Sequence, residues 1–245
     1  MKKITYDIEW NLERSHWWFI GRRRLLKVLL SSSRTHRNSP MIDAGCGVGS
    51  NLPLLESAGF KVIGVDSEFY SLSLLKKRLS DVSLVNGDLM NLPFKSNSIG
   101  IVIATDILEH LNEDTIGIKE IYRTMKREGE VIITVPAFRS LCGVQDIAGM
   151  HKRRYSRKEF IKKMEQEGFN ILRSSYFNFF LFFPILMARR MIHLMGLRIE
   201  SENEVNFPLI NFLFKAIFSL EVYVLKYFSF PFGVSILCIA KKREL

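Results

Sequence analysis

Short aliphatic runs alternate along this chain with longer segments of helical periodicity. The longer segments include residues 72–79 and 116–125. The short runs, rich in Val and Ile, cover residues 41–43, 61–66, 82–86, 99–104 and 130–135. This alternation predicts repeated βαβ units, and therefore an α/β fold with a doubly wound, mostly parallel sheet. Because ligands of such sheets bind beyond the carboxyl ends of the strands, the residues that follow each run are candidate site residues.

Three glycines at alternate positions follow the first predicted strand. Gly45, Gly47 and Gly49 lie between the run that ends at Asp43 and a helix-forming segment. Glycine tolerates backbone conformations that other residues avoid and has no Cβ, so such a loop turns sharply and lets its backbone approach a ligand. We therefore predict a cofactor-binding loop at this position.

Acidic residues lie at the ends of four predicted strands. Asp43 and Asp66 end the first and second, Asp88 follows the third, and Thr105-Asp106 follow the fourth. A single aspartate at a strand end is more often a turn or helix cap than a ligand. Four in register with a glycine loop favour a ligand site. One carboxylate can accept both ribose hydroxyls and another can face the amine of an adenine, so the pattern suits an adenosine.

Two phosphate-binding loops are alternatives for the glycine pattern. A nicotinamide-binding fingerprint counted from Gly45 requires a third glycine at position 50, where the chain has Ser50. A P-loop requires Gly-Lys-Ser/Thr after the loop, which this sequence lacks. Both alternatives are therefore weakened.

The motif Asp43-x-Gly45-x-Gly47-x-Gly49, with Asp66, Asp88 and the tripeptide at 108–110, resembles a class I S-adenosylmethionine-dependent methyltransferase with a type 11 or 12 domain. The resemblance covers residues 15–175. It implies a Rossmann-like methyltransferase fold with seven strands, and S-adenosyl-L-methionine as cofactor. The chain departs from the family pattern at Gly100 and at residues 127–129, which concern strand packing and a turn.

The resemblance also implies a cofactor site drawn from the N-terminal segment and from four strand ends. Its members are Trp18, Arg22, Asp43, Gly45, Cys46, Gly47, Gly49, Asp66, Ser67, Asp88, Leu89, Thr105 and Asp106. In this set Asp66 holds the ribose and Asp88 frames the adenine. The N-terminal segment closes over the cofactor, with Trp18 packed on it and Arg22 at its carboxylate. An amphipathic helix with a basic solvated face is the alternative for that segment.

Methyl transfer to a hydroxyl requires a base, and the candidate catalytic residues are His151, His110 and Asp146. His110 follows Glu109 after the fourth strand. Asp146 and His151 follow the fifth strand, where this fold places substrate-contacting loops. No metal site is predicted, because Glu109 and His110 alone do not make one.

The residues after His151 allow two interpretations. The stretch 151–155 resembles a His-x-Arg-Arg-Tyr motif of a bacterial and archaeal branch linked to surface-polymer or lipid-linked sugar metabolism, where the arginines would face a phosphate. Alternatively, Ser156 caps a helix, Glu159 completes a capping box, and the arginines are solvated.

Two apolar segments, at 177–188 and 207–232, separate the last predicted strands, at 169–176 and 234–240. Charged residues interrupt both, so we do not expect them to cross a bilayer. Aromatic residues beside basic ones favour helices on an anionic membrane surface; a substrate lid or a homodimer interface is the alternative. The expected organisation is an N-terminal closing segment (1–38), a methyltransferase core (39–176), an apolar helical insertion (177–233) and a final strand (234–245).

Charge and cysteine content complete the expectations. The net charge is +10, which indicates an anionic partner. Nucleic acid is disfavoured because no RNA-binding module is visible. Cys46, Cys142 and Cys238 are few and widely spaced, and acids interrupt the N-terminus where a signal peptide would be apolar. We expect a cytoplasmic protein, peripheral at the inner membrane face. It would methylate a small or lipid-linked acceptor, with oxygen preferred over nitrogen or carbon. An RNA methyltransferase and a non-catalytic scaffold are the alternatives.

Overall fold

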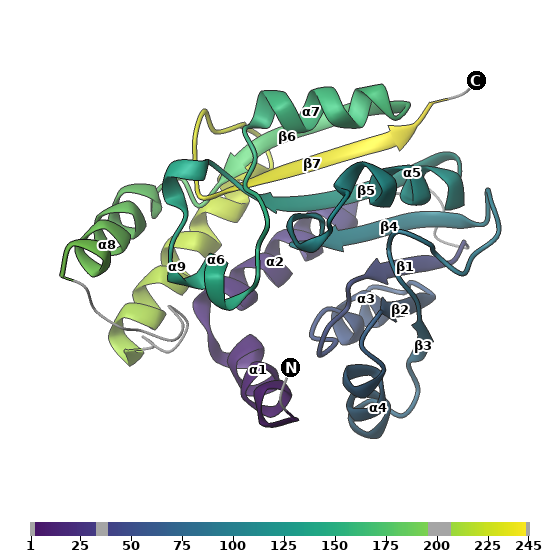
Figure 1. Ribbon diagram of the computed structural model, residues 1–245, viewed down its shortest axis with the longest axis horizontal. Helices are drawn as coiled ribbons and strands as arrows, with labels where there is room; N and C mark the ends of the chain where they lie inside the picture. The colour runs from purple at the N-terminus through teal and green to yellow at the C-terminus, as the bar shows by residue number, and fades with distance from the viewer. Residues whose placement is uncertain (1–2, 33–38, 196–206, 244–245) are drawn as a thin grey trace.

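A seven-stranded sheet crosses the computed structural model, which describes residues 3–32, 39–195 and 207–243 (Figure 1). The strand order is β3-β2-β1-β4-β5-β7-β6; β1 to β5 pair in parallel, and β7 is antiparallel to both of its neighbours. The strands are β1 Met41–Ala44, β2 Val62–Asp66, β3 Ser83–Asn86, β4 Ile99–Thr105, β5 Met125–Pro136, β6 Phe169–Phe177 and β7 Ser235–Lys242. The predicted seven-stranded, mostly parallel sheet is confirmed.

The two central strands of the sheet are mostly apolar and are buried along their whole length. Every residue of β1 and β4 is buried. Strands of this composition belong to sheets covered by helices on both faces. The helices are α1 Lys3–Ser15, α2 Trp17–Ser32, α3 Leu52–Ser57, α4 Phe69–Arg78, α5 Asp114–Thr124, α6 Val144–Ala148, α7 Arg157–Gln166, α8 Phe182–Met195 and α9 Pro208–Leu225, with short 3-10 turns η1 Leu108–His110 and η2 Arg139–Leu141.

Strand β5 is longer than the predicted run at 130–135. It begins at Met125, directly after α5, and pairs there with Ile99 of β4. The pairing then shifts register between Ile99 and Ile101, and Glu128 of β5 has a φ of 56°. Such an irregularity lets a strand continue through polar residues, which carry no aliphatic pattern for sequence reasoning to detect.

An apolar helical insertion precedes the last strand, as predicted: α8 and α9 lie between β6 and β7. By length and composition α9 is the one helix among the described residues that could span a membrane, and 22% of it is buried inside the molecule. It packs along α2 (Figure 1). The Asn211 side chain of α9 accepts a hydrogen bond from the Trp17 backbone N–H (2.6 Å) and donates one to the Ser15 carbonyl (3.0 Å). The predicted segment boundaries at 38, 176 and 233 stay predictions.

A glycine permits the close approach of α2 and α9. A Cβ on Gly21 would lie 1.9 Å from Cδ1 of Phe218. Phe218 is fully buried and stacks on Phe177, with 5.9 Å between ring centroids. The packing of the two helices therefore requires glycine at position 21, because any larger side chain would overlap Phe218.

We expect Gly21→Ala to lower the free energy of unfolding by about 1–3 kcal/mol through overpacking. Alanine otherwise stabilises a helix interior by about 1 kcal/mol over glycine, so a net loss identifies the contact with Phe218. Urea denaturation followed by circular dichroism measures the difference. A midpoint equal to or above that of the wild type would contradict this packing.

Candidate active site

The glycine loop follows β1 with all three glycines in left-handed conformations. The φ angles of Gly45, Gly47 and Gly49 are 72°, 52° and 77°. A Cβ on Gly45 would lie 2.7 Å from the Ile107 side chain, whereas a Cβ on Gly47 would meet nothing within 4 Å. Gly47 therefore presents bare backbone to open space, as a ligand-binding loop requires.

Asp66, at the end of β2, holds this loop. Its Oδ2 accepts the Gly47 backbone N–H (2.8 Å) and its Oδ1 accepts that of Glu68 (2.9 Å). The hydroxyl of Ser71 donates to the Gly47 carbonyl at 2.7 Å. A carboxylate has about four acceptor positions, so two of them stay available for a ligand's hydroxyls.

A cleft opens between these strand ends, with about 340 Å³ of empty space, part of it open to solvent. Five predicted cofactor residues meet in its wall: Gly45, Asp66, Ser67, Asp88 and Leu89. Carboxylates and apolar side chains in one cleft match the two chemical ends of a nucleoside.

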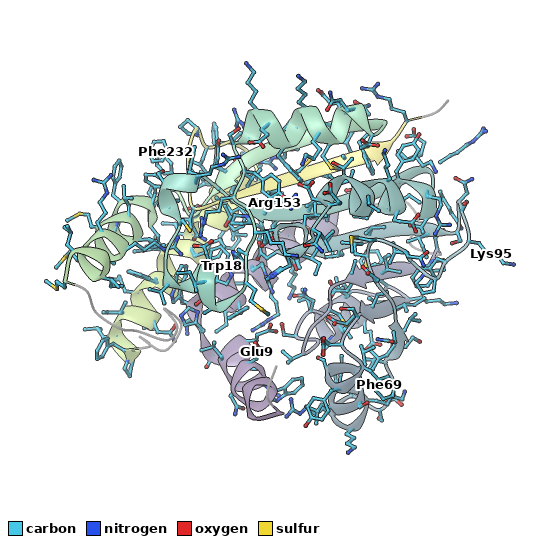
Figure 2. The ribbon with its side chains drawn as sticks, viewed as in Figure 1. Glu9, Trp18, Phe69, Lys95, Arg153 and Phe232 are labelled. Atoms are coloured by element: carbon cyan, nitrogen blue, oxygen red, sulfur yellow. The ribbon has the colours of Figure 1, made fainter. Side chains whose placement is uncertain are left out.

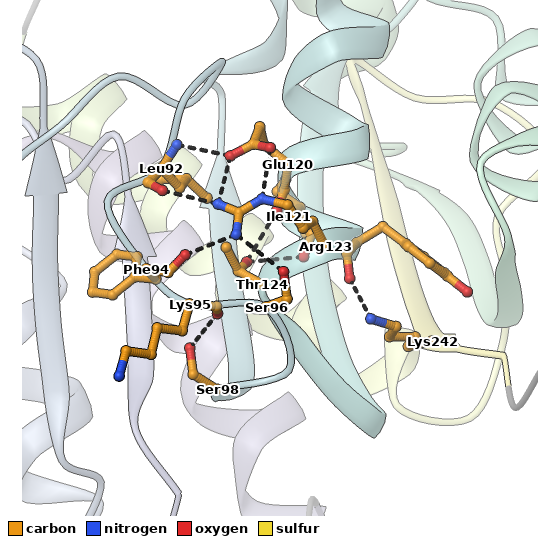
Figure 3. A network of polar contacts seen from close by, with 11 residues as sticks. Leu92, Phe94, Lys95, Ser96, Ser98, Glu120, Ile121, Arg123, Thr124 and Lys242 are labelled. Carbon is orange, nitrogen blue, oxygen red and sulfur yellow. Dashed lines mark hydrogen bonds and ion pairs between the residues drawn. The ribbon is translucent and has the colours of Figure 1, made fainter.

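A polar network supports the segment that carries part of this wall (Figure 3). The Arg123 guanidinium of α5 donates to the carbonyls of Leu92 (3.0 Å) and Phe94 (2.8 Å) and to the Glu120 carboxylate. Glu120 in turn accepts the Leu92 backbone N–H at 2.9 Å. Leu92, which lines the cleft, is thus held from two sides.

Sequence reasoning missed several residues around the cleft. Leu92, Ile107 and Leu111 line it. Their signal was an apolar side chain a few residues after a strand end. Glu9 of α1 had none, because only the fold brings α1 near Asp66. Burial, with the neighbouring carboxylates of Glu13 and Asp66, raises the pKa of Glu9 to about 7.

Asp43 lies beneath the loop rather than in the wall. It is 1% exposed; Asn51 Nδ2 lies 3.5 Å from its Oδ1, and within the described part of the chain its Oδ2 has no hydrogen-bond partner. Burial raises the pKa of Asp43 from 3.8 to about 7 against the opposing charge of Arg22. The position agrees with a role in orienting the loop, which stays a prediction.

This raised pKa predicts a pH dependence of stability. The folded state binds the Asp43 proton more tightly than the unfolded state, so its contribution is full below the unfolded pKa and is lost as pH rises through about 7. Each pH unit in this window is worth about 1.4 kcal/mol, or about 4 kcal/mol over the whole window. Asp43→Asn should therefore gain stability relative to wild type between about pH 4 and pH 8. Urea titrations at both ends measure the gain, and a pH-independent difference would contradict it.

Arg22 and Trp18, predicted to contact the cofactor, have protein partners in this structure. Arg22 Nη1 lies 2.7 Å from Asp106 Oδ2, and the Thr134 hydroxyl donates to Asp106 Oδ1 at 3.0 Å. Trp18 (Figure 2) stacks on Phe177 with 5.8 Å between ring centroids. Neither side chain lines the cleft in the described part of the chain, and their contacts with a cofactor stay predictions.

The remaining predicted cofactor residues have varied environments. Thr105, the last residue of β4, is 6% exposed. Cys46 is buried and donates its backbone N–H to the Val65 carbonyl at 3.0 Å. Gly49 packs against Leu75, where a Cβ would lie at 2.5 Å. Among the described residues, these three do not line the cleft, and their contacts with a cofactor stay predictions.

The three candidate catalytic residues meet after β4 and β5. His151 Nδ1 lies 3.0 Å from Asp146 Oδ1, and the His151 and His110 rings lie edge to face at 4.8 Å. Glu109 adds a carboxyl group that is fully buried and whose oxygens have no hydrogen-bond partner among the described residues. Burial, with the nearby charge of Asp106, raises the pKa of Glu109 well above its usual value. The side-chain atoms of Glu109, His110 and His151 that could bind a metal ion all lie within 4.8 Å of one another.

Asp146 is the centre of this group. Burial raises its pKa, but hydrogen bonds from His151 and Arg154 outweigh that effect and hold the pKa below its usual range. Arg154 donates from Nε (2.6 Å) and Nη2 (3.0 Å), and the Gly143 backbone N–H donates at 2.8 Å. An ionised, buried carboxylate against Nδ1 fixes the ring of His151 and directs Nε2 away.

The arginines after His151 are engaged inside the protein. Arg153 (Figure 2) pairs with buried Asp114 at 3.1 Å, and the Tyr155 hydroxyl donates to the same carboxylate at 2.8 Å. Ser156 caps α7 by accepting the Glu159 backbone N–H at 3.2 Å, as the alternative interpretation predicted. The arginines are not simply solvated, and both have carboxylate partners in place of a ligand phosphate.

Comparison with known proteins agrees with this geometry. Residues 42–133 match the family model described as "Methyltransferase domain". A Mycolicibacterium smegmatis protein named a probable S-adenosylmethionine-dependent methyltransferase is 24% identical over 65% of this chain and 62% of its own length. Staphylococcus epidermidis demethylmenaquinone methyltransferase is 29% identical over 62% of this chain and 66% of its own length. The first three curated relatives are covered over 45–63% of their length.

A solved structure shows the same fold. Haemonchus contortus phosphoethanolamine N-methyltransferase 2, in complex with S-adenosyl-L-methionine, superposes with a TM-score of 0.56 and 18% identity, over 90% of this chain and 52% of that one. The match over residues 42–133, the strand order and the glycine loop support a class I S-adenosylmethionine-dependent methyltransferase, with S-adenosyl-L-methionine as cofactor.

Proposed function

We propose that this chain transfers a methyl group from S-adenosyl-L-methionine to an oxygen of a small or lipid-linked acceptor. The observation that carries the proposal is a cleft lined by carboxylates and apolar side chains at the strand ends, together with the His151–Asp146 pair after the neighbouring strands. The cofactor carries an electrophilic methyl group on a sulfonium. When the methyl group is transferred, the sulfur becomes a neutral thioether. The protein's part is to align the acceptor and remove its proton.

The His151–Asp146 pair supplies the base. A carboxylate that holds Nδ1 orients the ring and stabilises the imidazolium that forms when Nε2 takes the acceptor proton. His110 packs against the same ring, and burial, with the nearby charge of His151, lowers its pKa. A neutral imidazole is therefore favoured at position 110, which makes His110 a second candidate for contact with the acceptor.

The surface of α8 and α9 supports an apolar or lipid-linked acceptor. On α8 the exposed side chains include Phe183, Met187, Met191 and Leu194. On α9 they include Leu209, Phe212, Leu213, Leu220 and Tyr223. We call these nine side chains the apolar face. Exposed apolar side chains gathered on one face of a helix mark an interaction site rather than an ordinary soluble surface.

Basic groups accompany the apolar face. Lys215 Nζ lies 5.8 Å from the Phe212 ring centroid and Lys226 Nζ lies 5.6 Å from that of Tyr227, while Arg190 is exposed on α8. Apolar and aromatic side chains beside basic ones suit a bilayer that carries anionic lipids. The proposal therefore places the protein in the cytoplasm, peripheral at the inner membrane face. The relative from Staphylococcus epidermidis, whose named substrate is demethylmenaquinone, supports an apolar acceptor.

We expect the full chain to sediment with vesicles of phosphatidylcholine and phosphatidylglycerol at low salt, and less with phosphatidylcholine alone. Added salt should release part of the bound protein, because the lysines and Arg190 contribute through screened charge. Leu213→Ser with Leu220→Ser should weaken sedimentation, since both side chains are exposed and their loss leaves the core intact. Protein that stays in the supernatant under all conditions would contradict the membrane surface and favour a substrate lid or a homodimer interface.

The reaction itself is tested with methyl-labelled S-adenosyl-L-methionine and a cell extract separated into lipid, small-molecule and RNA fractions. Label in the lipid or small-molecule fraction, on an oxygen by mass spectrometry, is the expected result. Label in RNA would support the RNA methyltransferase alternative. Absence of cofactor binding in a calorimetric titration would support a non-catalytic scaffold.

A further inference from the structure

Helix α8 has a second face, which contacts the loop that carries the catalytic pair. This loop, residues 137–151, follows β5 and ends at His151. The Phe182 ring packs edge to face on Phe138 at the start of the loop, with 6.0 Å between centroids. Further along α8, Arg189 Nη1 donates to the Leu141 carbonyl and lies 3.9 Å from Asp146 Oδ2. The helix therefore touches the loop at its start, its middle and its carboxylate.

The Asp146 carboxylate lies close to two arginines that come from different parts of the chain. Arg154 lies on the same chain segment as Asp146 and binds both of its oxygens. Arg189 comes from α8, 43 residues after Asp146. The side chains of Asp146 and Arg189 are 4% and 11% exposed, so the pair is shielded from water and from salt. Moving α8 would change the field and the contacts at Asp146 directly.

The opposite side of α8 is the part of the apolar face formed by Phe183, Met187, Met191 and Leu194. These residues follow one another at intervals of four, four and three, so they form a single stripe on the helix. All four are at least 50% exposed. Helix α8 thus has an exposed apolar stripe on one side, and its other side contacts the loop that carries Asp146 and His151.

We infer that Arg189 is a positioning residue that couples the outer face of α8 to the catalytic pair: when α8 lies on a lipid surface, Arg189 holds Asp146, and Asp146 holds His151. The inference rests on the membrane surface of the proposed function. A lipid surface that binds α8 in this position stabilises the loop arrangement that α8 contacts, because a ligand shifts an equilibrium toward the state it binds better. The loop is then ordered most where a lipid-linked acceptor is present.

Hydrogen exchange of the full chain, with and without vesicles of phosphatidylcholine and phosphatidylglycerol, tests this coupling. In the wild type, vesicles should slow exchange in α8 and also slow it by about tenfold in residues 143–151, the gain expected when one charged contact is made permanent. In Arg189→Gln, vesicles should still protect α8 but leave residues 143–151 unchanged. Arg189→Lys, which keeps the charge, should restore part of the loop protection.

Arg190→Gln is the matched control, because Arg190 is the exposed neighbour of Arg189 on the same helix. It should lose some vesicle affinity and keep the loop protection once bound. Equal loop protection in Arg189→Gln and wild type would overturn the inference, and so would vesicles that protect α8 but never the loop. The thermal transition of Arg189→Gln shows whether this variant folds. If it does not fold, Arg189→Lys decides: hydrogen exchange in residues 143–151 that is equally fast with and without vesicles overturns the inference as well.

This experiment needs neither cofactor nor acceptor. Absence of vesicle protection in α8 itself would remove both the inference and the membrane surface, while methyl transfer would stay open to its own assay. Vesicle protection of the loop in a protein that does not bind S-adenosyl-L-methionine would support the coupling and contradict the enzymatic proposal. The two failures are therefore distinguishable.

Discussion

His151→Asn is expected to lower kcat for methyl transfer by about 10²- to 10⁴-fold, the range for removal of a general base. The asparagine amide can keep a hydrogen bond to Asp146 near the former Nδ1 position, but nothing replaces Nε2. The acceptor then keeps its proton, and alignment by the cleft is all that remains of the catalysis. The effect is measured as the initial rate of label transfer from methyl-labelled S-adenosyl-L-methionine to the extract fraction that contains the acceptor.

Affinity for S-adenosyl-L-methionine should be unchanged in His151→Asn, because the described residues that line the cleft do not include His151. Calorimetric titration of the same variant checks this point. His16→Gln is the control, since His16 is a buried histidine that lies on the N-terminal segment, whereas His151 is half-buried. A rate within a few-fold of wild type would remove His151 as the base and leave His110 as the candidate.

Asp66→Ala is expected to weaken binding of S-adenosyl-L-methionine by about 10- to 100-fold, since hydrogen bonds to a charged group are worth about 1.5–3 kcal/mol. Two losses combine: the ribose loses its acceptors, and the loop loses the anchor that Gly47 and Glu68 bind. Because Asp66 lies at the rim of the sheet rather than in its core, the fold should persist. Titration calorimetry and a thermal transition measure the two quantities.

Two further variants separate the roles of Asp66. Asp66→Asn keeps one acceptor oxygen and should fall between wild type and alanine. Asp81→Ala removes an exposed aspartate in the turn before β3 and should bind like wild type. If Asp66→Ala and Asp81→Ala bind equally well, the ribose assignment is wrong.

The parts of the site that the sequence predicted share a local cause. Gly45, Asp66 and Asp88 lie at or just after strand ends, and parallel strands bring their carboxyl ends to one edge. Sequence order is therefore enough to predict that these residues meet. The glycine loop is equally local, because a positive φ is a property of single residues. The boundaries of β5 were missed because a strand irregularity removed the aliphatic pattern there.

The sequence does not predict which ion-pair partners the charged side chains have. Arg22 pairs with Asp106 across 84 residues, Arg153 with Asp114 across 39, and Arg189 approaches Asp146 across 43. A long side chain offers the same signal in sequence whether it is solvated, bound to a ligand or paired inside the protein. Burial and distance decide among these, and both arise from packing.

By itself the sequence determined the α/β class, the cofactor loop and the apolar insertion, because each follows from periodicity or from the conformational needs of single residues. The number of strands, seven, came from the family resemblance. Only the tertiary structure decided that Asp146 lies between His151 and two arginines, that Glu109 is buried beside them, and that α8 touches the loop at residues 137–151. These contacts depend on the relative placement of elements far apart in the chain. That placement is set by side-chain packing, which local patterns do not encode.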